Sequence, residues 1–166
     1  MTFAFGITWR DDGTQHDDIY VALGDEQYVA DSYYLAIESD DTTTPDESKT
    51  ETVTEVLIRL LTGWMHSLID AAPGDRVFLP FGFRDEAIDG IECTVESNTC
   101  RIRTGWIDRE GWSIPPSDIS RLITGAADCH AVEGAREHDA YLPWFINQLR
   151  CNISSLQHGP LEHFSK

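Results

Sequence analysis

The sequence has 166 residues, of which 41% are hydrophobic and 10% aromatic, and its formal net charge at pH 7 is −17. This length is typical of one domain that buries roughly 70% of its unfolded surface, and the apolar content excludes a disordered chain, so we expect a single globular domain over residues 1–166. The acidic excess excludes the basic face with which a nucleic-acid-binding protein neutralises phosphates, and it disfavours an anionic membrane surface, so a basic protein is the natural partner.

The N-terminal third predicts the beginning of an antiparallel sheet. Large apolar residues alternate with small or polar ones through residues 3–9, which indicates a strand with one buried face, and the turn formers of residues 11–13 follow it. Further strands are expected at residues 19–23 and 28–38. The polar segment 39–49 is rich in turn-forming residues and is a candidate for local disorder.

A long amphipathic helix is the next predicted element. Ser48 and Glu51 have the spacing of a capping box, and apolar residues then recur at helical spacing until Pro73-Gly74 ends the pattern. We expect a helix at 51–71 whose apolar stripe covers the sheet. The stripe consists of Val53, Val56, Leu57, Leu60, Leu61, Trp64 and Leu68.

A strand and a hairpin follow the helix. Residues 77, 79, 81 and 83 are apolar and alternate along one strand. A two-residue turn at Ser97-Asn98 fixes the register of the next pair of strands by arithmetic. The paired residues are then Val95 with Cys100, Cys93 with Ile102, Ile91 with Thr104, and Glu92 with Arg103. This register places the apolar residues on one face, so we expect both cysteines to be packing residues and the charged pair to lie on the opposite face.

Two tryptophans near residue 110 bear on function. By the same alternation Trp106 continues the buried face, whereas a turn at residues 108–111 pairs Ile107 with Trp112 and turns Trp112 to the opposite face. There Trp112 is either core, covered by residues 117–124 or the C-terminal helix, or an exposed aromatic anchor beside Asp108 and Glu110.

The C-terminal part holds the densest set of possible metal ligands. They are Cys129, His130, Glu133, Glu137, His138 and Asp139. No spacing typical of a zinc or iron site occurs, and Gly134 interrupts any helix, so we expect a solvated connecting loop with no metal or cofactor. A last helix is predicted at 139–156, with Pro143 in its first turn.

Other catalytic patterns give no assignment. The sequence contains no G-x-S-x-G elbow and no phosphate-binding glycine loop. His16-Asp17-Asp18 is interpreted as a solvated turn instead of a catalytic base with its partners. The four cysteines form no C-x-x-C pair, no apolar run reaches the ~18 residues of a membrane span, and the N-terminus lacks the pattern of a signal peptide, so we expect reduced thiols and a cytoplasmic protein.

The predicted fold is α+β: an antiparallel sheet of about six strands with the long helix and the C-terminal helix packed on it. The leading functional hypothesis is a non-enzymatic acidic inhibitor or immunity-type protein that binds and neutralises a basic protein, such as a bacterial toxin or nuclease. Its expected binding residues are Asp85, Glu86, Asp89, Asp108, Glu110 and Trp112. The alternatives are a small hydrolase with an Asp/Glu/His site at 128–139, and an acidic adaptor or subunit whose charge reflects a salt-adapted source.

Overall fold

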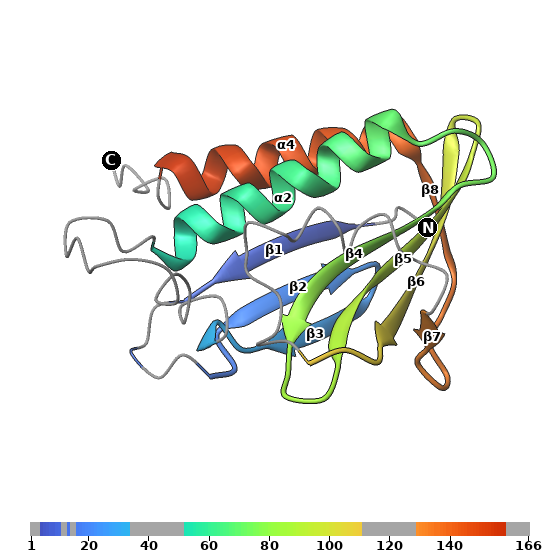
Figure 1. Ribbon diagram of the computed structural model, residues 1–166. Helices are drawn as coiled ribbons and strands as arrows, with labels where there is room; N and C mark the ends of the chain where they lie inside the picture. The colour runs from blue at the N-terminus through green and yellow to red at the C-terminus, as the bar shows by residue number, and fades with distance from the viewer. Residues whose placement is uncertain (1–3, 11–12, 14–15, 34–51, 111–128, 159–166) are drawn as a thin grey trace, which may run out of the picture.

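The computed structural model describes residues 4–10, 13, 16–33, 52–110 and 129–158. Over these residues the chain forms two helices and eight strands, and the strands divide into two antiparallel sheets (Figure 1). The α+β class is therefore confirmed. The single sheet of about six strands is corrected to one sheet of three strands and one of five.

The three-stranded sheet has the order β1-β2-β3, with β1 at Phe5–Trp9, β2 at Ile19–Leu23 and β3 at Glu26–Ala30. The expected third strand at 28–38 starts earlier and stops at Ala30; residues 34–38 lie outside the described part. Local hydrogen bonds explain why strand β3 ends at Ala30. The backbone N–H of Ser32 donates to the Asp18 carboxylate (2.8 Å), which takes the place of a strand-to-strand bond.

Helix α2, at Val53–Asp70, matches the predicted stripe, whose seven residues are all buried. Its N-cap is Thr52, not Ser48. The Thr52 hydroxyl accepts from the Glu55 N–H (3.3 Å), and the Glu55 carboxylate accepts from the Thr52 N–H (2.8 Å), so the capping box lies one turn later than predicted. The helix ends at Ala71 as expected. The polar segment 39–49 lies outside the described residues.

Helix α4, at Leu142–His158, starts three residues later than predicted, because the preceding strand β8, at His138–Tyr141, pairs with β6. Figure 1 shows α2 and α4 side by side along β1. Phe5 of β1 contacts both helices, with ring centroids 6.4 Å from Trp64 and 5.0 Å from Phe145. These rings form the centre of the core between the helices and the first sheet. No helix in the described part of the chain is long and apolar enough to cross a membrane.

The five-stranded sheet contains β4 at Arg76–Phe83, β5 at Ile88–Glu96, β6 at Thr99–Ile107 and β7 at His130–Ala131, with β8 also paired to β6. The predicted hairpin register is confirmed at all four pairs. Both of its cysteines are fully buried, and all four cysteines of the chain are free.

Strand β4 departs from the predicted alternation at a β-bulge. The pairing shifts between Pro80 and Gly82, so Gly82 pairs with Asp89 and Phe83 pairs with Ile88. Phe83 therefore shares a face with Ile88, not with Leu79. Proline cannot donate a strand hydrogen bond, which is why a bulge is tolerated here.

Candidate functional site

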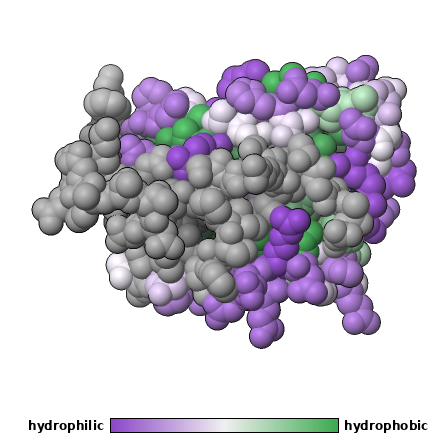
Figure 2. Space-filling view, in the orientation of Figure 1, coloured by the Kyte–Doolittle hydropathy of each residue, from purple (hydrophilic) through white to green (hydrophobic). Residues whose placement is uncertain are grey.

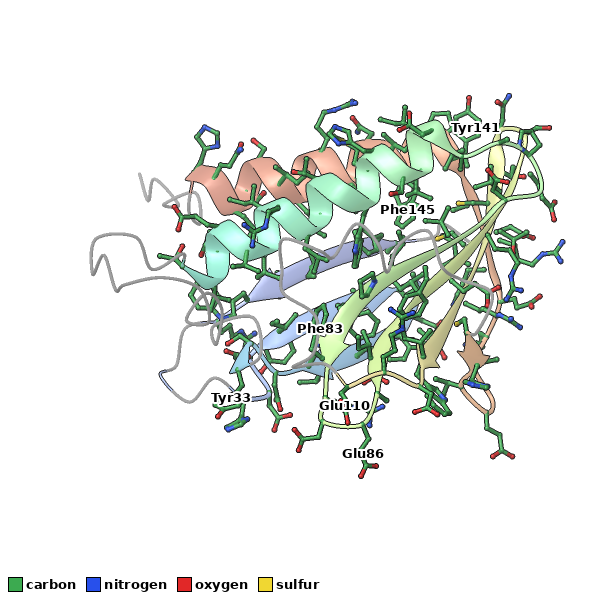
Figure 3. All side chains as sticks on the ribbon, viewed as in Figure 1. Tyr33, Phe83, Glu86, Glu110, Tyr141 and Phe145 are labelled. Carbon is green, nitrogen blue, oxygen red and sulfur yellow. The ribbon has the colours of Figure 1, made fainter. Side chains whose placement is uncertain are left out.

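Two acidic turns lie side by side at one end of the five-stranded sheet. Residues 84–87 join β4 to β5, and residues 108–110 follow β6. Both lie where Ile88 pairs with Ile107, at the opposite end of the hairpin from Ser97-Asn98. Residues 84–87 and Asp108 line one open hollow of about 570 Å³ together with Trp106. Figure 3 shows Glu86 and Glu110 projecting from this end, which we call the acidic end.

The predicted binding residues differ in burial. Asp85, Glu86, Asp108 and Glu110 are exposed, as are the two arginines of these turns, Arg84 and Arg109. With Asp89 included, the acidic end carries five carboxylates and two guanidinium groups. Figure 2 shows that hydrophilic side chains dominate the lower edge of the molecule. Trp112 lies outside the described residues.

Asp89 is the half-buried member of the set. Its side chain is 29% exposed, and its Oδ1 accepts from Nη2 of Arg84 at 2.6 Å. Burial raises the pKa of Asp89, although the neighbouring guanidinium opposes that shift. The ionised carboxylate is therefore held where the protein disfavours its charge, a pattern found often at functional sites.

Trp106 is not the core residue that the alternation predicted. It pairs with Asp89 across β5 and β6, is half-buried, and packs on His130 with ring centroids 4.6 Å apart. The alternation identified its face of the sheet correctly. It did not show that the indole would be only half-buried and would line the hollow.

A second hollow, which we call the side groove, shares Trp106 and Arg84 with the first. It measures about 420 Å³ and runs between β3 and the turn after β7. Tyr28 and Val29 line one side, and Trp106 and Val132 the other. The Tyr28 hydroxyl lies 3.2 Å from Oγ1 of Thr104, which links β3 to β6 and fixes this wall.

The groove is also where apolar surface is exposed. Val29 is 48% exposed and Val132 39%. They are two of the five large hydrophobic residues that are exposed in the described part of the chain, and both line this groove. Asp89 and Arg84 line it too, so the groove combines an aromatic wall, apolar edges and one ion pair.

The residues of segment 128–139 do not converge. His130 packs at a tilt against Trp106, His138 lies 3.2 Å from Glu26, and Asp139 lies 4.0 Å from Arg101. Among the described residues no three His, Cys, Asp or Glu side chains are placed to hold a metal ion. The segment also is not one connecting loop, because it contains β7 and the start of β8.

The cysteine of this segment is a poor nucleophile at neutral pH. Burial, followed by the nearby Glu92 carboxylate, raises the pKa of Cys129 to about 11. The thiolate is therefore scarce, and the thiol packs beside the sheet at Gly105.

The predicted solvated turn at His16-Asp17-Asp18 is corrected for Asp18. His16 is 61% exposed, but Asp18 is buried, and its carboxylate accepts from Trp9 Nε1 (3.1 Å) and from Ser32 N and Oγ (2.8 and 2.5 Å). These bonds join the β1–β2 turn to the end of β3. Asp18 therefore has a structural role.

No family model, curated protein or solved structure matches this chain. Its function is therefore inferred from the chemistry of the acidic end and the side groove.

Proposed function

We propose that this protein is a non-enzymatic inhibitor of the immunity type, which binds a basic protein such as a bacterial toxin or nuclease and neutralises it. The observation that carries the proposal is the acidic end: two acidic turns from separate parts of the sequence flank a half-buried tryptophan. The proposed contact residues are Asp85, Glu86, Asp89, Asp108, Glu110 and Trp112, and we add Trp106 because it lines the hollow between them.

The two kinds of side chain have different roles in such an interface. Exposed carboxylates at a rim speed the encounter with a positively charged partner and select against acidic ones. An aromatic ring that becomes fully covered on binding contributes most of the affinity. Trp106 is placed for the second role, because it lies between the two acidic turns and is already half-buried in the free protein.

The two alternatives make different demands. A hydrolase at 128–139 requires converging groups, and the described residues of that segment face different partners, so no observation favours it. An acidic adaptor would use the same surface as an inhibitor. Only the activity of the bound partner separates these two roles.

Affinity capture from the source cells tests the proposal when three versions of the chain are compared. One is the natural protein, and one carries Asp85→Lys, Asp108→Lys and Glu110→Lys. The matched control carries the same charge change at three exposed acids outside the acidic end: Asp70 at the end of α2, Glu96 at the end of β5, and Asp139 on β8.

We expect the natural protein and the control to capture the same basic protein, and the acidic-end variant to lose it. The unfolding midpoint of each version, measured first, shows that all three are folded. Equal capture by all three versions, or a captured partner that is itself acidic, contradicts the proposal.

A further inference from the structure

The side groove contains an ion pair, Arg84–Asp89, in which another guanidinium group can replace that of Arg84. Arg84 reaches Asp89 through a single nitrogen, Nη2, and its own side chain is 59% exposed. Glu92, elsewhere in the same sheet, is held differently, because Arg76 and Arg103 each approach it with two nitrogens. Because the Arg84 side chain is well exposed, it can turn outward into water at small cost when another guanidinium takes its place on the half-buried Asp89 carboxylate.

The surroundings of Asp89 suit a guanidinium group with an apolar stem. The rings of Tyr28, Phe81 and Trp106 line the groove, and Val29 and Val132 are exposed at its edges. A planar guanidinium stacks on aromatic faces and binds carboxylates through its fork of N–H groups, whereas its methylene stem packs on apolar surface. A purely apolar occupant would instead cover the Asp89 charge without a partner.

We infer that the side groove binds an arginine side chain of the partner protein, whose guanidinium replaces that of Arg84 on Asp89 while its stem packs against Trp106 and Tyr28. Arg84 then occupies the site in the free protein and turns outward on binding. That the arginine belongs to a partner protein rests on the proposed function, whereas the preference of the groove for a guanidinium group does not.

The probe is a short peptide, acetyl-triarginine amide, compared with the citrulline peptide of the same length. Citrulline has nearly the same shape as arginine and no charge. Binding is followed by the NMR signal of the Trp106 indole N–H, assigned with Trp106→Phe. We expect the arginine peptide to shift this signal in a saturable way and the citrulline peptide to leave it in place.

Two pairs of variants localise the effect. Asp89→Asn should weaken binding at least about tenfold, whereas Asp139→Asn, the same change on β8, should leave it within about twofold. Arg84→Gln should strengthen binding by about threefold or more over Arg109→Gln, because both remove one positive charge from the acidic end but only Arg84 competes for Asp89. Equal effects within either pair, or equal binding of the citrulline peptide, would overturn the inference.

The outcomes separate this inference from the proposed function. If the peptide binds as described and no basic partner is captured, the groove is an arginine site and the inhibitor proposal fails. If the partner is captured through the acidic end and Asp89→Asn has no effect on the peptide, the inhibitor proposal stands and the groove inference fails. Unfolding midpoints of Asp89→Asn and Arg84→Gln exclude a trivial loss of structure.

Discussion

The substitution Glu92→Gln tests the description of the five-stranded sheet, because Glu92 holds a buried charge on the face opposite the hairpin cysteines. The Glu92 side chain is only 3% exposed. Its Oε1 accepts from Nε and Nη2 of Arg76, both at 2.5 Å, and its Oε2 accepts from Nε and Nη2 of Arg103 at 2.8 and 2.6 Å. A glutamine keeps the shape but offers one acceptor, so its amide N–H₂ group must face one of the two guanidinium groups.

The expected cost follows from which group is left without a partner. Removing one member of a fully buried ion pair typically costs about 3–5 kcal/mol. Here the arginines are 41% and 32% exposed, so the displaced guanidinium recovers part of its hydration. We therefore expect a loss of about 2–3 kcal/mol of unfolding free energy, which corresponds to roughly 5–10 °C in melting temperature for a domain of this size.

Urea unfolding of Glu92→Gln, with Glu96→Gln as the control, measures this difference. Glu96 lies on the same strand and pairs with Arg101 at 3.0 Å, but both side chains are about half exposed (51% and 48%). The control should therefore lose less than about 1 kcal/mol. Equal midpoints for the two variants would refute the claim that Glu92 is buried between two arginines.

Three further predictions address packing, thiol access and charge. Gly90→Ala places a methyl group against the ring of Phe78, so calorimetry should show a loss of about 1–3 kcal/mol or more of unfolding free energy, whereas Gly6→Ala, with no atom within 4 Å, should change little. In the native protein the exposed Cys151 should react rapidly with an alkylating reagent, whereas the buried Cys93 and Cys100 should react only after denaturation, since burial raises the pKa of Cys100 to about 12. Equal labelling of the three cysteines by mass spectrometry would contradict the hairpin register. The raised pKa of Asp89 means that the folded state favours the neutral carboxyl, so its contribution to stability is present below the unfolded pKa of about 3.9 and is lost as pH rises through the folded pKa. Asp89→Asn should therefore be at least as stable as the natural protein at pH 7, and the difference should vanish near pH 3. A large loss of stability at pH 7 would show that the carboxylate has a structural role.

Alternation and turn spacing were enough to predict the hairpin, because a shift of one residue would have moved every apolar side chain to the wrong face. They were not enough for features set by single residues. The bulge at Pro80–Gly82 inserts one residue without changing the apolar pattern, so Phe83 was assigned to the wrong face. Asp18, which the sequence pattern places in a solvated turn, is instead buried and accepts the hydrogen bonds of Ser32 just beyond the end of β3.

The part of the candidate site that lies on the hairpin was predictable from the sequence, and the rest was not. The hairpin register implies that the two acidic turns lie at one end of the sheet and that Asp89 lies opposite Trp106, as the structure shows. The other wall of the side groove was not predictable, since Tyr28 and Val132 come from segments that no local pattern connects to the hairpin. Trp112, the predicted anchor, lies outside the described residues and stays a prediction.

The most direct test of the proposed inhibitor is a titration of the captured partner's own activity. Increasing amounts of the natural protein should abolish that activity at about one chain per partner molecule. The variant with Asp85→Lys, Asp108→Lys and Glu110→Lys should require a large excess, with an association rate about tenfold slower at low salt and less sensitive to added salt. Full activity of the partner in a saturated complex would contradict the account, because the acidic end would then bind without neutralising.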